Sequence, residues 1–350
     1  MRKIQIGIDS FAAAFTEQSS RVSDSQRLLE LIEQIEYADK MGLDSFGVGE
    51  HHRKGFLDSA PVVILGAAAV RTSKIRLTSA VTVLSAADPV RVFQEFATLD
   101  LLSKGRAEMV AGRGSFVEAF PLFGYDLSDY DELYEEKLDL LLMIRDNENV
   151  TWSGTFRPSL AGQGVYPRPV QNPFPIWIGV GGTPESFVRA GKLGLPLMVA
   201  IIGGETGDFG PLVELYKKTA QRYKHPLDQL KVGMHSPGYV AETFQKAADD
   251  FFPGWAGAMN SISTERGWRP MNRADFDAQL GPDGAFLIGD PDQVAEKIIH
   301  HSKELGGLTR VTFMMNAASL PHEKIMRAIE LLGTRVAPLV QEKLEKENPE

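Results

Sequence analysis

Three short runs in this chain combine residue types and spacing that suit chemistry. The first is Glu50-His51-His52, the second centres on Arg113 between two glycines, and the third is the hexapeptide GGTPES at residues 181–186. Imidazole groups exchange protons or bind metals near neutral pH. Arginines hold phosphate or carboxylate oxygens through paired N–H groups. The chain therefore carries residues for proton transfer and for anion binding.

The GGTPES run predicts an anion site at the start of a helix. Thr183 suits the N-cap and Pro184 the first helical position. Gly181 and Gly182 leave the preceding backbone N–H groups uncovered, and Ser186 adds a hydroxyl to that of Thr183. Unpaired N–H groups and the positive end of the helix dipole attract anions. The alternative is an ordinary capped junction between a strand and a helix.

Arg113 strengthens the anion interpretation. It lies between Gly112 and Gly114, directly after a predicted strand over Arg106–Ala111. If that strand neighbours the one that leads to Pro184, the guanidinium reaches the same edge of the sheet and can clamp a phosphate there. Without such a neighbour, it would be a surface arginine in a flexible turn.

The Glu50-His51-His52 run follows a predicted strand over Ser45–Gly49. In strand geometry His51 shares a face with Gly47 and Gly49, which would leave room there for a flat ligand. A metal site would need about three further ligands, and of the other histidines only His235 is placed to face the same opening. Metal binding is therefore disfavoured, and the simplest interpretation of His52 is a polar residue satisfied by a backbone carbonyl.

The elements that must position these residues alternate between strand and helix. Predicted strands are Lys3–Ile8, Ser45–Gly49, Ile75–Leu84, Arg106–Ala111, Ile176–Val180, Leu197–Ile202, Val232–Val240 and Arg310–Met315. Predicted helices are Gln26–Met41, Ala60–Arg71, Pro89–Leu102, Tyr130–Arg145, Pro184–Leu193, Pro211–Tyr223, Glu242–Phe252, Pro291–Leu305 and Glu323–Leu332. Eight strands, each followed by helix, predict an α/β fold: a closed parallel (β/α)8 barrel whose site lies at the carboxyl ends of the strands.

The barrel is expected to be a single domain over residues 1–350, with two insertions. The proline-rich Thr151–Pro175, after the fourth helix, predicts extended chain without regular structure. The polar Asn260–Ala285, after the seventh strand, predicts an irregular segment. A Rossmann-type open sheet is disfavoured, because no glycine follows the first strand in Asp9-Ser10-Phe11-Ala12-Ala13.

Composition excludes several classes of protein. The 350 residues carry a formal net charge of −9, which argues against binding to nucleic acid or to anionic membranes. The absence of cysteine excludes disulfides, a thiolate nucleophile and cysteine-ligated metals, and it is compatible with a reducing cytoplasm. No apolar stretch of 18 residues is present, so no membrane span is expected.

In these motifs and their order, the chain resembles the bacterial luciferase-like, flavin-dependent monooxygenases. The resemblance rests on blocks in order along nearly the whole chain: residues 38–44 (ADKMGLD), 49–52 (GEHH), 88–91 (DPVR), 99–106 (LDLLSKGR), 112–114 (GRG), 181–186 (GGTPES) and 288–291 (IGDP). The Glu-His-His and Ser-Lys-Gly-Arg blocks at this spacing make it specific.

The resemblance implies a TIM barrel that binds reduced FMN. The flavin phosphate would lie at Arg113, Gly181, Gly182, Thr183 and Ser186. A cis peptide bond at Ala80–Val81 would pack under the isoalloxazine. His51 would act in catalysis as general acid or base, oriented by His52 and Glu50. Residues 260–285 would form a mobile lid that protects the reaction from water.

The reaction implied by the resemblance is monooxygenation of a small organic substrate by O2 through a flavin C4a-hydroperoxide. A separate NAD(P)H:flavin reductase would supply FMNH2, and a homodimer is expected. An F420-dependent oxidoreductase, a non-catalytic FMN-binding protein and a metal-dependent hydrolase remain as alternatives. Four phenylalanines near predicted loops, Phe11, Phe15, Phe116 and Phe120, suggest an apolar substrate, although core packing explains them as well.

Overall fold

The computed structural model describes residues 3–14, 22–267, 269–315 and 320–347. The strands are β1 (Gln5–Ser10), β2 (Ser45–Val48), β3 (Arg76–Ser79), β4 (Thr82–Val83), β5 (Met109–Gly112), β6 (Asn149–Trp152), β7 (Leu160–Gly164), β8 (Ile176–Val180), β9 (Leu197–Ala200), β10 (Val232–Val240), β11 (Leu287–Gly289) and β12 (Arg310–Met314).

The α-helices alternate with these strands along the chain. They are α1 (Asp24–Lys40), α2 (Pro61–Ala69), α3 (Pro89–Ser103), α4 (Ala119–Leu122), α5 (Tyr130–Asp146), α6 (Pro184–Leu193), α7 (Gly210–Arg222), α8 (Phe244–Arg266), α9 (Arg273–Ala278), α10 (Pro291–Glu304), α11 (His322–Leu331) and α12 (Ala337–Glu347). Among the described residues, no helix combines the length and apolar character that a membrane crossing requires.

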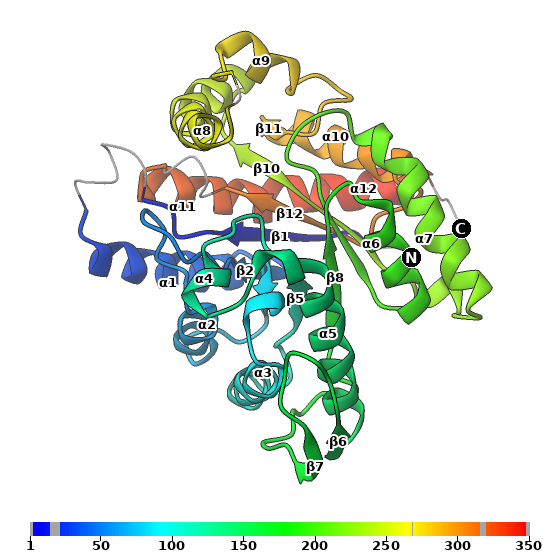
Figure 1. The fold of residues 1–350 in the computed structure, drawn as a ribbon. Coiled ribbons are helices and arrows are strands. Elements are labelled where there is room, and N and C mark those ends of the chain that lie inside the picture. Colours follow the sequence, from blue (N-terminus) through cyan, green and yellow to red (C-terminus); the bar gives the residue numbers. More distant parts are fainter. Residues whose placement is uncertain (1–2, 15–21, 268, 316–319, 348–350) are drawn as a thin grey trace.

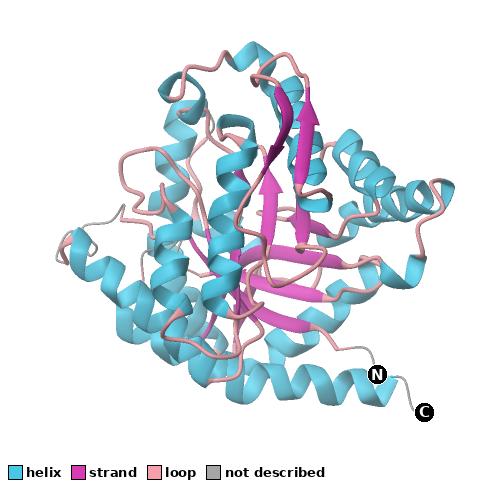
Figure 2. Ribbon diagram, turned by 90° about the horizontal axis from the view of Figure 1, so that it is seen from below, coloured by secondary structure: helices cyan, strands magenta, loops and turns pink. Residues whose placement is uncertain are grey.

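The strands form a parallel ring in the order β1, β2, β3/β4, β5, β8, β9, β10, β12 and back to β1. Strands β3 and β4 act as one interrupted strand, because β3 pairs with β2 while β4 pairs with β5. The ring closes where Leu77 N–H donates to the Arg106 carbonyl and Glu108 N–H donates to the Leu77 carbonyl, both at 3.0 Å. Helices surround the strands on the outside (Figures 1 and 2). The predicted barrel is therefore confirmed.

Helix α3 illustrates how local sequence sets the boundaries of these elements. It begins after Asp88, whose side chain accepts hydrogen bonds from the N–H groups of Val90 and Arg91. It ends at Lys104 in the left-handed conformation. Arg106 then donates to the carbonyl oxygens of Ala69 and Ile75, at 2.9 and 2.8 Å. The Ser-Lys-Gly-Arg block thus links the end of α3 to the end of α2 and to the start of β3 through hydrogen bonds.

The insertion before β8 contains a hairpin that the proline pattern did not predict. Strands β6 and β7 pair antiparallel, with Asn149 opposite Gly164, and the hairpin projects beside the lower end of α5 in Figure 1. The prediction of a segment without regular structure is wrong here, because the prolines flank β7 at positions 158 and 167 rather than occupying it.

The insertion after β10 also differs from the prediction. Helix α8 does not end at Phe252 but continues through Pro253 to Arg266, and α9 and β11 follow. An internal proline costs a helix about 3 kcal/mol. The continuation buries Trp255 and Ala258 against the barrel, which offsets that cost. Residues 260–285 therefore contain the end of α8 and all of α9, which lie over the top of the barrel in Figure 1.

Candidate functional site

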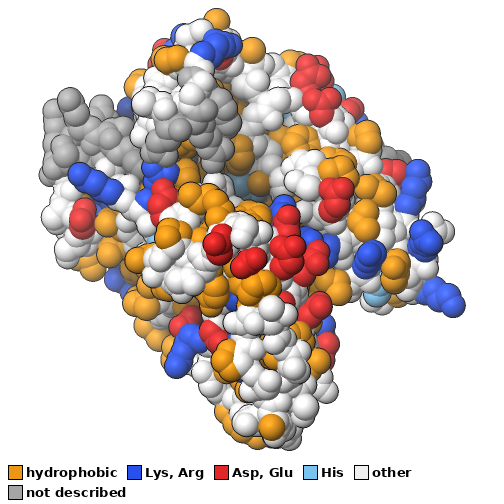
Figure 3. All heavy atoms as spheres, in the orientation of Figure 1, with side chains coloured by type: hydrophobic (Ala, Val, Ile, Leu, Met, Phe, Trp, Pro, Cys, Tyr) orange, Lys and Arg blue, Asp and Glu red, His pale blue; other side chains and the backbone are white. Residues whose placement is uncertain are grey.

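A cavity of about 660 Å³ opens at the carboxyl ends of the barrel strands. Its size falls within the roughly 300–1,000 Å³ of small-molecule sites. Figure 3 shows the opening as a hollow in the middle of the face, with acidic side chains on its rim. Predicted site residues among its lining are Glu50, His51, Ala80, Val81, Arg113, Gly181 and Thr183. Gly182, Ser186 and His52 do not line it.

One corner of the cavity joins Arg113 to the first turn of α6. The Arg113 Nη2 donates to the Ser186 Oγ over 3.2 Å. Thr183 occupies the N-cap position of α6, yet its hydroxyl makes no capping hydrogen bond. Gly181 and Gly182 are exposed, and an added Cβ on either would meet nothing within 4 Å. The Arg113 guanidinium, the Thr183 hydroxyl and the N-terminus of α6 therefore lie together at the rim of the cavity.

Arg113 also has protein partners at this corner. It forms an ion pair with Asp131, in the first turn of α5, and its guanidinium lies 5.1 Å from the centre of the Tyr130 ring. Burial raises the pKa of the Tyr130 hydroxyl, and the charge of Arg113 opposes that rise. An anion bound at this corner would have to compete with Asp131 for the guanidinium.

The peptide bond between Ala80 and Val81 is cis, as the resemblance implies. It lies between β3 and β4, and both of its residues line the cavity. A Cβ at Gly112 would lie 2.6 Å from Val81 Cγ2, and one at Gly179 would lie 2.9 Å from Val81 Cγ1. Both glycines therefore make room for Val81. The Glu50 carboxylate accepts a hydrogen bond from Val83 N–H over 2.8 Å, which ties the Glu-His-His run to this interruption.

His51 is held by a carboxylate that the sequence did not reveal as its partner. Its Nδ1 lies 2.8 Å from Asp58 Oδ2, and both residues are buried, at 8% and 0% exposed. Burial raises the pKa of Asp58, and the hydrogen bond with His51 opposes that rise. The His51 ring lies among Phe11, Phe56 and Phe116, with its centroid 4.3 Å from that of Phe56.

Two expectations about this histidine need correction. Asp58, and not Glu50 or His52, orients His51. The room beside Gly49 holds protein atoms rather than a flat ligand, because a Cβ there would lie 2.6 Å from Phe11 and 2.7 Å from Asp58. The strand ends at Val48, so the strand period that placed the glycines beside a ligand does not extend to His51.

His52 and Glu50 form a separate pair. The His52 Nε2 lies 2.9 Å from Glu50 Oε1, and the His52 ring packs edge-on against Phe123. The two adjacent histidines thus point to different carboxylates. Over the described ranges, no group of three or more His, Asp or Glu side chains is arranged to hold a metal ion.

A second histidine–aspartate pair lies in the same cavity. The His235 Nδ1, on β10, is 2.6 Å from Asp9 Oδ2 on β1 and 3.3 Å from Thr312 Oγ1 on β12. The sequence placed His235 near the opening but offered no sign of Asp9 as its partner, since 226 positions separate them.

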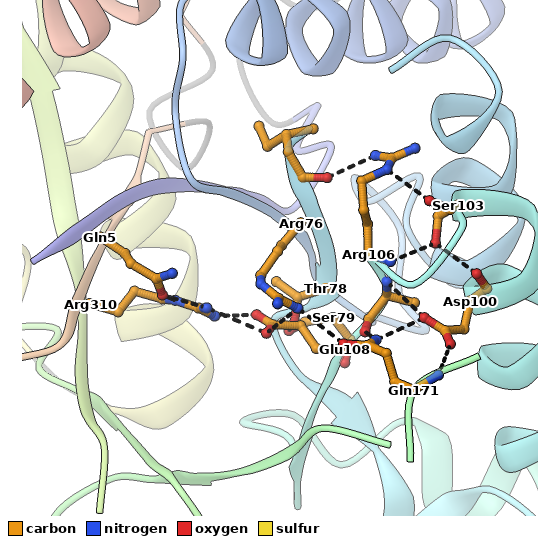
Figure 4. Close-up of polar contacts among 12 residues, drawn as sticks. Gln5, Arg76, Thr78, Ser79, Asp100, Ser103, Arg106, Glu108, Gln171 and Arg310 are labelled. Atoms are coloured by element: carbon orange, nitrogen blue, oxygen red, sulfur yellow. Dashed lines mark hydrogen bonds and ion pairs between the residues drawn. The ribbon is translucent and has the colours of Figure 1, made fainter. Parts of the chain in front are cut away.

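A buried ion pair closes the floor of the cavity. Arg310, at the start of β12, pairs with Glu108 and donates to Gln5 Oε1 over 2.8 Å, as Figure 4 shows. Its guanidinium lies 4.6 Å from the centre of the Trp177 ring. Arg76 adds a second cation, 3.7 Å from Glu108. Glu108 therefore balances the charge of the buried Arg310, while the side chain of Arg76 is partly exposed.

The remaining walls are largely apolar. Phe11 and Phe116 line the cavity, whereas Phe120 is fully buried in packing, and Phe15 lies outside the described residues. Helix α8 forms a roof with Trp255, Ala258, Met259 and Ile262. An uncharged, largely apolar molecule suits this space beyond the Arg113 corner.

Known proteins share this sequence pattern. The family described as luciferase-like monooxygenase matches residues 9–309. The 4-hydroxyprotoasukamycin monooxygenase of Streptomyces nodosus subsp. asukaensis is 25% identical over 88% of this chain and 85% of its own. The alkanal monooxygenase alpha chain of Photorhabdus laumondii subsp. laumondii is 24% identical over 94% and 96% of the two chains.

Solved structures share the fold. Monooxygenase RslO1 from Streptomyces bottropensis superposes with a TM-score of 0.82 at 23% identity, over 96% of this chain and 99% of its own. The oxygenating constituent of 3,6-diketocamphane monooxygenase from Pseudomonas putida, in complex with FMN, gives 0.76 at 18% identity, over 97% and 99%. The F420-dependent tetrahydromethanopterin reductase of Methanopyrus kandleri gives 0.72 at 20%, over 96% and 99%. The chain belongs to the luciferase-like monooxygenase family and is an oxidoreductase of that class.

Proposed function

We propose that this enzyme is an FMN-dependent monooxygenase that inserts one oxygen atom of O2 into a small, largely apolar organic substrate. The observation that carries the proposal is the meeting of Arg113 with the N-terminus of α6 at the rim of a cavity that also contains His51. The corner formed by Arg113 and the N-terminus of α6 suits the phosphate of FMN. His51 suits proton transfer at the flavin ring, beyond that phosphate.

The residues present fit FMN. Its phosphate would be held by the Arg113 guanidinium, the Thr183 and Ser186 hydroxyls and the backbone N–H groups around Gly181 and Gly182. The flavin ring would lie against Ala80 and Val81, which form one wall of the cavity. When bound and reduced, the cofactor supplies the reaction with O2, and the protein supplies orientation and exclusion of water.

His51 would hold or deliver a proton near that ring. Asp58 accepts from Nδ1, which leaves Nε2 of the neutral imidazole as the atom that takes up a proton. The three aromatic rings around His51 keep bulk water away from this transfer. Glu50 and His52 would support the site through Val83 and the interrupted strand rather than through His51.

Residues 260–285 would act as a lid over the bound reactants. Ile262, in the last turns of α8, already faces the cavity. The far end of the segment is anchored, because Lys297 donates to the carbonyl oxygens of Gln279 and Phe286. Helix α9, which lies between the cavity-facing end and the anchored end, is the part that would adjust to a ligand.

A separate NAD(P)H:flavin reductase would supply the reduced cofactor, in a reducing cytoplasm compatible with a chain that has no cysteine.

A homodimer would cover the apolar surface of α2 and α3, where Val63, Val70 and Leu102 are 74%, 71% and 50% exposed. Light scattering during gel filtration tests the dimer: a monomeric mass at micromolar concentration would contradict it.

The proposed activity is tested with photoreduced FMN. The protein is titrated with it under anaerobic conditions and then mixed with oxygenated buffer in a stopped-flow instrument. We expect stoichiometric binding and a flavin absorbance that passes through a distinct species before oxidised FMN appears. Reoxidation at the rate and with the spectrum of free reduced FMN would contradict the proposal.

The second candidate is an F420-dependent oxidoreductase. The shared fold of the F420-dependent reductase favours it, and so does the F420-dependent glucose-6-phosphate dehydrogenase of Amycolatopsis mediterranei, which is 30% identical over 47% of this chain and 51% of its own. Parallel titrations with FMN and F420 separate the two candidates. Binding of F420 alone would replace the first proposal by the second.

A further inference from the structure

The cavity contains a second imidazole whose chemistry is set by its partners. The His235 Nδ1 lies 2.6 Å from Asp9 Oδ2, and both residues line the cavity while being only 7% and 3% exposed. Within the described part of the chain, no hydrogen bond engages His235 Nε2. The backbone is shaped for this pair, because a Cβ on Gly47 would lie 2.1 Å from Asp9 Oδ1.

The pairing dictates what His235 offers to a ligand. A carboxylate at hydrogen-bond distance from Nδ1 requires the proton to be on that nitrogen. The neutral ring then presents the lone pair of Nε2 as a hydrogen-bond acceptor. Thr312, 3.3 Å from Nδ1, adds a second contact that keeps the ring in place.

The position of His235 separates it from the predicted phosphate corner. Its strand, β10, and the strand of Asp9, β1, flank β12 on either side. In the ring of eight strands, β12 lies opposite β5, which leads to Arg113. The Phe11 ring lies between the two imidazoles, 4.7 Å from that of His51 and 5.9 Å from that of His235. Arg310, which also lines the cavity, is paired with Glu108.

We propose that His235 Nε2 accepts a hydrogen bond from an O–H or N–H group of the molecule in the cavity, with Asp9 and Thr312 as its positioning residues. The aromatic and apolar walls around it assign this donor to the substrate, which is then an apolar, ring-containing molecule that bears a hydroxyl group. The other source of such a donor is an N–H group on the flavin edge. The inference rests on the proposed function, because it places the substrate and the flavin in the same cavity.

Binding of 2-naphthol is compared with binding of 2-methoxynaphthalene, which has the same rings but no donor. Calorimetry on the purified protein without FMN gives both dissociation constants. We expect the wild type to prefer naphthol about five- to tenfold, the ratio expected of one net hydrogen bond. Asp9→Asn and His235→Phe should each abolish the preference. Asp58→Asn makes the matched change at His51 and should leave it intact. A preference that persists in both Asp9→Asn and His235→Phe overturns the assignment.

A second measurement needs no ligand. Nitrogen NMR of the labelled protein reports which ring nitrogen of His235 carries the proton. We expect Nδ1–H in the wild type and Nε2–H in Asp9→Asn, whose amide donates to Nδ1 instead of accepting from it. Nε2–H in the neutral ring of the wild type would overturn the proposal even if a variant failed to fold.

Titration with FMN distinguishes the two sources of the donor. If Asp9→Asn weakens FMN binding about tenfold while the naphthol preference stays unchanged, the donor belongs to the cofactor and the substrate assignment is overturned. If the wild type binds no FMN but keeps the naphthol preference, the proposed function fails and this inference stands.

Discussion

His51 and Asp58 form a buried hydrogen bond of 2.8 Å between Nδ1 and Oδ2, seven positions apart in the chain. The carboxylate fixes the orientation of the ring from the side away from Nε2. The packing of Phe56 against the imidazole, at 4.3 Å between centroids, holds it from one face. Proton transfer by this histidine therefore depends on a residue that need not touch the reactants itself.

The Asp58→Asn variant tests that dependence. The amide preserves the shape of the side chain but donates to Nδ1, so Nε2 carries the proton and the ring no longer accepts one there. We expect the reaction of bound reduced FMN with O2 and substrate to slow by about 10²-fold, within the range of general acid–base catalysis. The dissociation constant for FMN should change less than threefold. An unchanged rate, measured by stopped-flow absorbance, would show that Asp58 has no such role.

The barrel itself was predictable because its strands are short, β-branched runs separated by helical patterns. The run IRLTSAVTVL at residues 75–84 predicted one strand and occupies the β3/β4 position of the ring. Helix α8 was predicted too short because proline ordinarily ends a helix, whereas here the burial of Trp255 sustains it. Local pattern does not report such tertiary packing.

The candidate site was predictable only in part for the same reason. The Arg113 corner follows from two motifs that flank neighbouring strands, and the structure brings Arg113 and Ser186 into contact. The partners of the histidines could not be predicted, since Asp58 and Asp9 are ordinary single carboxylates in the sequence. Nothing in a residue pattern states which carboxylate a buried imidazole will meet.

Asp131 competes with the predicted phosphate for Arg113. It is paired with the guanidinium, and its side chain is 63% exposed. Asp131→Asn should therefore tighten FMN binding by about two- to fivefold, the range that corresponds to a surface ion pair. Glu132→Gln removes the same charge one position away and should change the affinity less. Equal effects of the two variants would attribute the gain to net charge alone.

Glu108 is the charged partner of the buried Arg310 at the floor of the barrel. Glu108→Gln would leave Arg310, which is 2% exposed, without its charged partner. We expect the free energy of unfolding in urea to fall by about 3–5 kcal/mol. Glu36→Gln, at an exposed pair with Lys40 and Arg71, should cost at most about 1 kcal/mol. A similar loss in both variants would contradict this role of the buried pair.

Lys297 makes stability depend on pH. Burial lowers its pKa from 10.5 to about 7, while its Nζ donates to the Phe286 carbonyl over 2.8 Å. Between these two pKa values the unfolded chain binds more protons than the folded one, so the free energy of unfolding rises with pH in that window and is flat below it.

The measurement is urea unfolding at about pH 7 and about pH 9. Over that interval the wild type should gain up to about 2 kcal/mol relative to Lys297→Met, which has no ionisable group there. Lys40→Met, at an exposed lysine paired with Glu36, should keep the wild-type pH dependence. A parallel pH dependence of wild type and Lys297→Met would contradict the buried-lysine account.

The central claim is that the phosphate of FMN binds where Arg113 meets the N-terminus of α6, and fluorescence titration of FMN against three variants tests it most directly. Arg113→Ala should weaken binding about 10- to 100-fold, the value of a charge-assisted hydrogen bond. His51→Ala should weaken it less than threefold. Arg189→Ala, which removes an α6 arginine paired with Glu135 outside the cavity lining, should also leave it near the wild-type value. Wild-type affinity in Arg113→Ala would contradict the account.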